Sequence, residues 1–348
     1  MSSSQPVGVL GAGSFGTSIA NLLAFNGEVL LFSRKAETVD TINSTRKHLG
    51  VDVALRVTAT DDLAEMAERC TLILPIVPSN SFRQMIRSLA PHLRPHHIII
   101  HGTKGLDLHD MEEEDLDRPH LSLSRANVRT MSEVVLEESS VVRVGCLSGP
   151  NLAAEIMAGQ PAATVVGSRF REVIQAGQAA LNSPKFHVFG SYDILGAELA
   201  GALKNIVALG SGIVGGLGLG RNIQGLLIAK GLAEMIYVGK ALGASSQAFI
   251  GIAGIGDLVA TATSVNSRNY TFGTRLAKGE TVQQIRSTMP ELAEGVRTLH
   301  IAHHLARQHK LHVPITDMLY AVVFERYPIE KALQYLMTYP YAVDVDFL

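Results

Sequence analysis

Short apolar runs alternate with helical patterns in the first half of the chain. The first run, Val7 to Leu10, ends at a glycine, and in the helical pattern that follows Ile19, Leu22 and Leu23 share one face. Further strands are predicted at 29–32, 53–58, 71–77, 97–101, 141–147, 163–166 and 186–189. Continuous apolar strands separated by helices are typical of a parallel sheet that is covered on both faces.

After about residue 192 the strand signals end and a helical period dominates. Leu195, Leu199 and Leu203 fall on one helical stripe. Further helices are predicted at 222–243, 281–288, 291–309 and 314–336. The predicted fold class is therefore α/β, with an N-terminal Rossmann-like doubly wound sheet followed by an all-α C-terminal domain. Residues 1–192 would form the dinucleotide-binding domain and residues 193–348 the all-helical substrate-binding domain, in keeping with the chain length.

The composition narrows the possible partners. The formal net charge of -2 gives no general attraction to nucleic acid or to an anionic membrane, so an anionic ligand would need a local basic site. Cys70 and Cys146 show neither metal-ligand spacing nor a disulfide framework, and both are expected in the core. The N-terminus lacks the features of a signal peptide, and glycines and charges interrupt the apolar region 195–242. The sequence favours a cytoplasmic protein with no nucleic-acid partner and no membrane insertion.

A glycine-rich hexapeptide with the sequence GAGSFG follows the first strand and opens the first helix. In this pattern Gly11 permits a tight turn, Gly13 lets the backbone approach a pyrophosphate, and Gly16 lets the helix pack closely on the strand. Ser14 and Phe15 lie inside the same turn, where the helix start offers N–H groups to a phosphate. An ordinary strand-to-helix turn is the alternative, but the position at the start of a predicted βα unit favours a dinucleotide cofactor.

The end of the second strand indicates which dinucleotide is used. NAD enzymes often carry Asp or Glu there, whereas this strand runs into Ser33, Arg34 and Lys35. Two cations and a hydroxyl suit a 2′-phosphate better than a 2′-hydroxyl group. Arg34 therefore favours NADP, although NAD use stays open, and solvated loop charges are the alternative interpretation.

Several further motifs occur in a fixed order along the chain. Val77-Pro78-Ser79 and Thr103-Lys104-Gly105-Leu106 each follow a predicted strand. The remaining motifs are LSGPNLAAE at 147–155, ELAGALKN at 198–205, GIGDL at 254–258, SRNYTFG at 267–273 and EGV at 294–296. From Gly11 to about Pro314 this series resembles the bacterial type of NAD(P)-dependent glycerol-3-phosphate dehydrogenase.

The resemblance implies a reaction and a set of site residues. The reaction is the reversible reduction of dihydroxyacetone phosphate, a small phosphorylated substrate, to sn-glycerol 3-phosphate, serving glycerophospholipid synthesis in a homodimer with NADP or NAD as cofactor. Lys204 resembles the catalytic acid/base, and Lys104 and Asp257 would assist it. The further substrate contacts that the resemblance implies are Gly149, Asn151, Asn205, Ser267, Arg268 and Asn269, and the further cofactor contacts are Ala153, Arg268, Leu292 and Glu294.

The chain departs from the family pattern in two places. Asn151 stands where the family more often has Ser or Thr, although an amide can still donate a hydrogen bond. The segment 107–125 is longer and more acidic than the usual connection. Its acidic patch, Asp107 to Asp117, has no period and is predicted to be a solvated loop.

The residue types suit the implied chemistry. Hydride addition to a ketone leaves negative charge on its oxygen, so a proton donor must stand beside that oxygen. Lys204 lies in an apolar helical pattern, and burial would lower the pKa of its ammonium toward neutrality. The guanidinium group of Arg268 could bind a phosphate with two parallel hydrogen bonds. The alternatives are a lysine that reaches the surface, a surface arginine, and an Asp257 that caps a helix.

Three other functions are compatible with parts of this sequence. A sister dehydrogenase for another hydroxy acid or sugar acid, a silent dinucleotide sensor and a purely structural dimer module remain as alternatives, and Lys104, Lys204 and Asp257 together disfavour the sensor.

The glycines of 210–220 are predicted to let helices pack closely or bend, because no nucleotide-triphosphate loop ending follows them. The histidines His300, His303 and His304 are predicted to be solvated or packed, and the aromatic cluster of Tyr335, Tyr339 and Tyr341 is predicted to pack near the C-terminus.

Overall fold

The structure is a computed structural model that describes residues 5–111, 113–118, 121, 123–289, 291 and 293–339. The chain divides into two compact units. Unit 1 comprises Met1–Asp107 with Thr130–Glu198, and unit 2 comprises Leu108–Arg129 with Leu199–Leu348. The chain therefore crosses between the units three times, after Asp107, after Arg129 and after Glu198.

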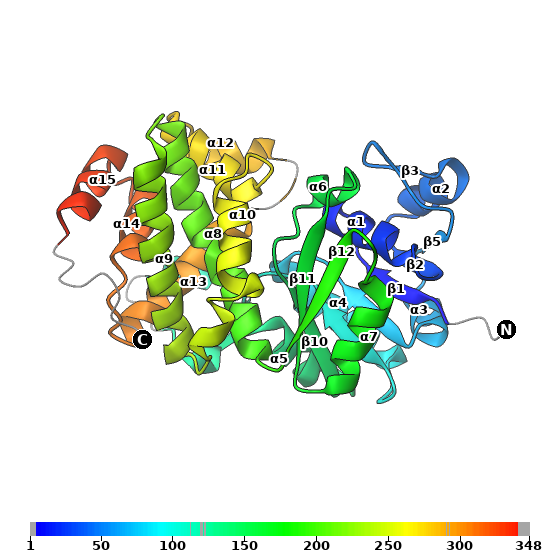
Figure 1. Cartoon of the computed structure of the whole chain (residues 1–348). Helices are drawn as coiled ribbons and strands as arrows, with labels where there is room; N and C mark the ends of the chain where they lie inside the picture. The colour runs from blue at the N-terminus through cyan, green and yellow to red at the C-terminus, as the bar shows by residue number, and fades with distance from the viewer. Residues whose placement is uncertain are drawn as a thin grey trace. The chain divides into compact units, whose positions relative to one another are not determined.

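Unit 1 is built on an eight-stranded sheet (Figure 1). Its strands are β1 (Val7–Leu10), β2 (Val29–Phe32), β5 (Val57–Thr60), β6 (Leu72–Pro75), β7 (Ile98–His101), β10 (Arg143–Ser148), β11 (Ala162–Ser168) and β12 (Phe186–Ser191). Their order in the sheet is β12-β11-β10-β7-β6-β1-β2-β5. Every neighbouring pair is parallel except β10 with β11, which is antiparallel. A separate hairpin pairs β3 (Lys47–His48) with β4 (Val51–Asp52).

Helices cover both faces of this sheet. Side chains alternate along each strand, so Val9 of β1 belongs to one apolar core and Leu10 belongs to the other. The first core includes residues of α1 (Ser14–Leu23), α2 (Ala36–Thr45) and α7 (Arg171–Leu181), and the second includes residues of α3 (Leu63–Arg69), α4 (Ser79–Leu89) and α5 (Met131–Glu138). Cys70 and Cys146 are buried, as predicted. This is the doubly wound arrangement that the apolar strand runs predict.

Two strand predictions need correction. The third strand begins at Val57 rather than at Val53, because the Val53 N–H donates to Arg46 and not to a strand. The two final strands, β11 and β12, run against the rest of the sheet. A parallel connection usually needs a full crossover helix. The chain between β10 and β11 contains only the five-residue helix α6 (Ala153–Met157), and it turns back beside β10.

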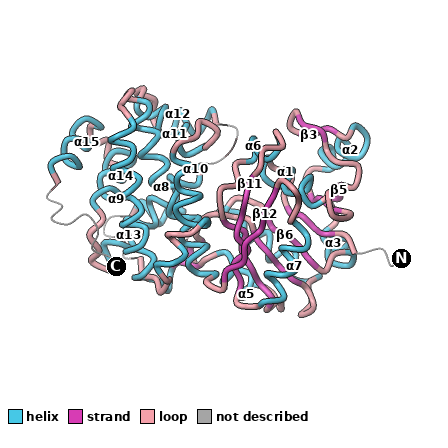
Figure 2. Tube along the Cα trace, viewed as in Figure 1, coloured by secondary structure: helices cyan, strands magenta, loops and turns pink. Residues whose placement is uncertain are grey.

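Unit 2 consists mainly of helices, as Figure 2 shows in cyan. They are α8 (Ile194–Gly216, whose first turn belongs to unit 1), α9 (Arg221–Ala241), α10 (Asp257–Ala262), α11 (Arg268–Ala277), α12 (Val282–Thr288), α13 (Glu294–Gln308), α14 (Pro314–Phe324) and α15 (Ile329–Thr338). The single helix predicted at 314–336 is therefore two helices. Arg326 adopts a left-handed φ of 56°, and Pro328 lacks the N–H that a continuous helix would need.

Helix α8 is the apolar centre of unit 2. Of the described residues it is the one helix whose length and composition would suffice to cross a membrane, and 89% of its most apolar window is buried. Its glycines let α11 approach closely, as the sequence predicts. A Cβ atom added at Gly212 would lie 2.0 Å from the carbonyl oxygen of Tyr270, and one at Gly273 would lie 2.0 Å from that of Leu209. The two helices thus meet backbone to backbone.

The acidic segment is not simply a solvated loop. Asp107 pairs with the guanidinium group of Arg83, which lies 2.9 Å away through Nε and 2.7 Å away through Nη2. The Asp107 side chain is buried, and the ion pair with Arg83 offsets the cost of removing its charge from water. Asp107–Leu108 forms the short strand β8, which pairs with β9 (Val128–Arg129). The prediction of a solvated patch is therefore wrong at Asp107.

The histidine group of α13 is packed inside unit 2. His300, His303 and His304 are all buried, and the ring of His303 stacks on Tyr320 with centroids 3.7 Å apart. Within the part of the chain that the structure describes, no group of three His, Cys, Asp or Glu side chains could hold a metal ion. Tyr335 and Tyr339 contact each other edge to face, whereas Tyr341 lies outside the described residues.

Candidate active site

The glycine turn of unit 1 is shaped by steric limits. Gly11 has a φ of 116°, and a Cβ atom there would lie 2.2 Å from the carbonyl oxygen of Ile76. A Cβ atom at Gly16 would lie 1.8 Å from the carbonyl oxygen of Gly11. Glycine is therefore required at both positions, and the turn brings the start of α1 directly onto the end of β1.

The start of α1 suits an anion. Gly13 is its exposed N-cap, Ser14 and Phe15 are its first two residues, and its first turn carries no acidic side chain. The first N–H groups of a helix have no intrahelical acceptor, and the helix dipole adds partial positive charge there. This geometry can receive a phosphate group without a lysine or arginine in the turn.

The end of β2 lies beside this turn, since the Gly11 N–H donates to the carbonyl oxygen of Phe32 over 3.1 Å. Arg34 follows and is exposed, whereas the Ser33 hydroxyl accepts the N–H of Lys35.

His48 was not predicted at this site. Its Nε2 lies 2.7 Å from the carbonyl oxygen of Ala12, inside the glycine turn. A single histidine in a two-residue strand gives no periodic signal in the sequence that could have predicted this contact.

Lys104 meets the loop that follows β10. Its Nζ donates to the carbonyl oxygen of Gly149 over 2.7 Å, and Gly149 itself has a φ of 145°. Asn151 donates from Nδ2 to the Thr164 hydroxyl over 2.8 Å, while its buried Oδ1 has no hydrogen-bond partner. Lys104, Gly149 and Asn151 therefore gather beyond the carboxyl ends of β7 and β10, where open α/β sheets bind ligands.

Ala153 connects this loop to the cofactor turn. It begins α6, and its carbonyl oxygen accepts the hydroxyl of Ser18 over 3.3 Å. Since Ser18 belongs to α1, Ala153 is held against the helix that the glycine turn opens.

Lys204 of unit 2 is a buried cation with two buried partners. Its exposed fraction is 5%, and its Nζ lies 3.1 Å from Oδ1 of Asp257. Nζ also donates to the hydroxyl of Thr261, which lies 3.2 Å from the same carboxylate oxygen. Lys204 does not reach the surface, and the N-cap of α10 is Gly256 rather than Asp257. Thr261 was not predicted, although it lies one helical turn after Asp257 on the same face.

A second polar chain lies next to Lys204 in the sequence. The side chain of Asn269 donates to Oδ1 of Asn205 over 2.8 Å and accepts the N–H of Gly295 over 2.8 Å. A Cβ atom at Gly295 would lie 2.7 Å from Asn205 O, so a larger residue would push this chain apart. Glu294 begins α13 directly before Gly295. Leu292 lies outside the described residues.

The start of α11 presents a cation near these groups. Ser267 is the N-cap, and its hydroxyl accepts the N–H of Tyr270 over 3.3 Å. The Arg268 side chain is 48% exposed, and its Nη1 lies 3.2 Å from Oε2 of Glu291. A half-exposed guanidinium group at a helix start can bind an oxyanion, with the Glu291 contact as its present partner.

Together these groups define what each unit can do chemically. Unit 1 offers a phosphate-binding helix start and a lysine beyond the sheet. Unit 2 offers a buried ammonium group that a carboxylate and a hydroxyl orient, and a cation suited to an oxyanion. The first set is suited to binding a dinucleotide and the second to proton transfer and to binding an oxyanion.

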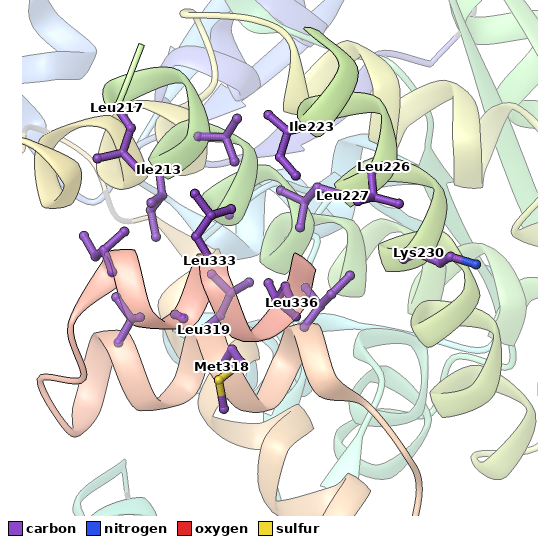
Figure 3. Close-up of a pocket in the computed structure, with 16 residues that line it drawn as sticks. Ile213, Leu217, Ile223, Leu226, Leu227, Lys230, Met318, Leu319, Leu333 and Leu336 are labelled. Atoms are coloured by element: carbon purple, nitrogen blue, oxygen red, sulfur yellow. The ribbon is translucent and has the colours of Figure 1, made fainter. Parts of the chain in front are cut away.

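Unit 2 also contains an apolar hollow, shown in Figure 3, between α8, α9, α14 and α15. Its volume is about 670 Å³ including the open mouth, and Lys230 is the one charged residue among those that line it. None of the predicted site residues lines it. Apart from Lys230 the residues that line it are apolar, so the hollow does not supply the hydrogen-bonding groups of the candidate site.

Comparison with known proteins gives consistent matches. The family models for the N-terminus and the C-terminus of NAD-dependent glycerol-3-phosphate dehydrogenase match residues 6–174 and 193–334. Glycerol-3-phosphate dehydrogenase [NAD(P)+] of Saccharophagus degradans is 37% identical over 99% of this chain and 93% of its own length. That of Streptomyces coelicolor is 39% identical over 96% of this chain and 97% of its own length. The crystal structure of glycerol-3-phosphate dehydrogenase from Coxiella burnetii has a TM-score of 0.85 at 31% identity, covering 96% of this chain and 99% of that one.

Proposed function

The chain belongs to the NAD-dependent glycerol-3-phosphate dehydrogenase family, and from this premise we propose how its residues divide the reaction. The protein is an oxidoreductase that reduces dihydroxyacetone phosphate to sn-glycerol 3-phosphate with NADH or NADPH. Reduced nicotinamide supplies a hydride, which carries two electrons, to the carbonyl carbon C2. The ketone oxygen then needs one proton, which the protein has to supply.

Lys204 delivers that proton. The observation that carries this assignment is its burial beside Asp257 and Thr261, with Nζ 3.1 Å from the carboxylate. The N–H bond of the ammonium breaks as the O–H bond of the product alcohol forms. Asp257 and Thr261 hold Nζ in one orientation, which spares the reaction the entropy cost of a mobile lysine. In the oxidative direction the neutral amine takes the proton of the C2 hydroxyl.

Arg268 and Asn269 bind the substrate phosphate, with Ser267 and Asn205 completing that part of the pocket. The exposed guanidinium and the helix start of α11 support this role, because both favour an oxyanion. Arg268 would exchange Glu291 for the more highly charged phosphate.

Lys104, Gly149 and Asn151, all in unit 1, also bind the substrate. Their shared position beyond β7 and β10 supports this assignment. Lys104 also touches the cofactor, which adds charge complementarity at the reacting end.

The cofactor binds along the glycine turn of unit 1. The further cofactor contacts are Gly11, Gly13, Ser14, Phe15, Gly16, Arg34, Ala153, Arg268, Leu292 and Glu294. Arg34, exposed after β2, favours the 2′-phosphate of NADPH over the hydroxyl of NADH. Residues 1–192 accordingly serve as the dinucleotide-binding domain and residues 193–348 as the substrate-binding domain. The enzyme works as a cytoplasmic homodimer that feeds glycerophospholipid synthesis.

The test is the pair Lys204→Met and Lys240→Met. Lys240 is an exposed lysine near the end of α9, so its replacement controls for loss of a positive charge in unit 2. We expect Lys204→Met to lower kcat by about 10²–10⁴-fold, which is the usual contribution of a general acid. NADPH binding, followed by fluorescence, should be unchanged in both variants. A Lys204→Met enzyme that keeps more than about a tenth of the kcat would contradict this assignment, because such a loss is well below what a general acid contributes.

A further inference from the structure

Glu198 is a buried carboxylate that none of these roles uses. It lies in the second turn of α8 with an exposed fraction of 7%. Its Oε1 lies 2.8 Å from Nε2 of His101 and accepts the backbone N–H of Ser132 over 2.8 Å. Its Oε2 accepts the hydroxyl of Ser132. Burial acts to raise the pKa of Glu198, but the bonds from His101 and Ser132 hold it below the ordinary value, so the group is ionised.

Three elements of unit 1, β7, α5 and the start of α8, supply His101, Ser132 and Glu198. His101 is the last residue of β7, three positions before Lys104. Ser132 lies in the first turn of α5, just after the chain has re-entered unit 1 at Thr130. Glu198 is the last residue of unit 1 before the final crossing, and it lies six positions before Lys204 on the same helix. The Glu198 carboxylate therefore links the end of β7, which precedes Lys104, to α8, which carries Lys204.

Glu234 makes a comparable contact with a helix start inside unit 2. It is likewise buried, and it accepts the N–H groups of Ile315 and Thr316 and the hydroxyl of Thr316 at the start of α14. All of these residues belong to unit 2. Glu234 and Glu198 thus make the same kind of helix-start contact, but only Glu198 does so where the chain passes from one unit to the other.

We propose that Glu198 is a positioning residue for catalysis, which fixes the N-terminal part of α8 to β7 and α5 and thereby the position of Lys204, which the same helix carries. This inference rests on the proton-donor role assigned to Lys204. Ionised carboxylates hold buried donors strongly and leave little freedom to the helix that carries them. If these contacts are lost, the N-terminal part of α8 is no longer held to β7 and α5.

The first experiment replaces Glu198 by Gln. The amide keeps the shape but removes the negative charge, and with its oxygen at the Oε1 position its NH2 group faces the Ser132 hydroxyl, which then has to accept instead of donate. We expect kcat to fall at least tenfold, while the dissociation constant of NADPH stays within about twofold. With deuterium at the transferred position of NADPH, the isotope effect on kcat should rise, because hydride transfer itself slows. A variant that merely contains less folded enzyme would leave the isotope effect unchanged.

Glu234→Gln is the matched control. It removes a buried helix-start carboxylate away from the crossings, so it should lower the melting temperature yet keep kcat within about twofold, as substitutions outside the reacting groups do. Both variants are compared with wild type at a temperature where all are folded. The proposal is overturned if Glu198→Gln keeps the wild-type kcat and isotope effect, or if Glu234→Gln reproduces its kinetic defect.

Variants of His101 keep the test decisive if Glu198→Gln does not fold. His101→Leu removes the donor, and His101→Gln restores an N–H near the position of Nε2. We expect the first to lower kcat about tenfold and the second to recover at least half of it, since one hydrogen bond to a charged group is at stake. Equal activity of His101→Leu and His101→Gln would refute the proposed positioning role of Glu198. Lys204→Met is assayed in parallel: if it stays active, the proton-donor role fails, whereas an inactive Lys204→Met beside a fully active Glu198→Gln refutes only the positioning role.

Discussion

The hydroxyl of Thr261 accepts a hydrogen bond from the Lys204 ammonium group and lies 3.2 Å from the carboxylate of Asp257. All three side chains are buried, so water cannot replace any of them without a change in packing. Lys204 comes from α8, while Asp257 and Thr261 are one turn apart on α10. The orientation of the lysine is therefore fixed by two donor–acceptor contacts from a single helix.

Thr261→Val tests this arrangement, because valine has nearly the shape of threonine and lacks only the hydroxyl. The ammonium group then loses one acceptor and gains freedom, so we expect kcat to fall about tenfold with little change in KM. Thr263→Val is the control, since the Thr263 hydroxyl is exposed and bonds only within its own helix. Steady-state kinetics with dihydroxyacetone phosphate would measure both. Equal losses in the two variants would show that the effect is not due to the contact with Lys204.

Arg268→Lys tests the phosphate contact. Lysine keeps the charge but cannot make two parallel hydrogen bonds to an oxyanion, so the KM for dihydroxyacetone phosphate should rise about tenfold. Arg275→Lys, in the same helix but paired with Glu280, should leave KM unchanged. An additional comparison with unphosphorylated dihydroxyacetone is informative. If Arg268→Lys lowers activity on both substrates equally, the arginine does not bind the phosphate.

The pH dependence of stability should report on Glu234. Burial raises the pKa of Glu234 to about 7 from an ordinary value of 4.5, against the effect of its three hydrogen bonds. A folded-state pKa above the unfolded one means that the folded protein holds the proton more tightly. The stabilisation is fully present below the unfolded pKa, and about 3 kcal/mol of it is lost as the pH rises through 7. Urea unfolding of wild type and Glu234→Gln at several pH values between about 5 and 8 would measure it, and parallel stability curves would rule it out.

Arg34→Ala should shift the cofactor preference toward NADH. The exposed guanidinium group would pair with the 2′-phosphate, and its loss should lower kcat/KM for NADPH about tenfold while NADH is little affected. Arg69→Ala provides a matched control, because Arg69 is an exposed arginine of the same unit that pairs with Glu65. The ratio of the two cofactor rates is the quantity to follow. An unchanged ratio would assign Arg34 to the solvated surface.

The sequence predicts features that depend on local pattern. Strand runs, the glycine turn and the close approach at Gly212 could be predicted because apolar period and missing Cβ atoms act over a few residues. Thr261, His48 and Glu198 could not, because each acts through a partner far away in the chain. The direction of β11 also depends on the length of the preceding connection.

Two further predictions were wrong. The break between α14 and α15 was visible in Pro328, yet the apolar period on both sides concealed it. The burial of Asp107 depends on Arg83, whose distance in sequence hides the pairing. Lys204, Arg268 and Asn269 were identified by resemblance, since no single pattern distinguishes them from ordinary helix residues.

The contact between α8 and α11 has a consequence for substrate length. At Gly212 and Gly273 the two backbones meet directly, because a Cβ atom at either position would lie 2.0 Å from a carbonyl oxygen of the other helix. Lys204 is carried by α8, and Arg268 and Asn269 begin α11. In the proposed site, the main-chain contact between α8 and α11 therefore sets the distance from Lys204, the proton donor, to Arg268, which binds the phosphate. Exchanging side chains at either end would then change charge or reach, while the distance between the two helices would stay as the backbone contact sets it.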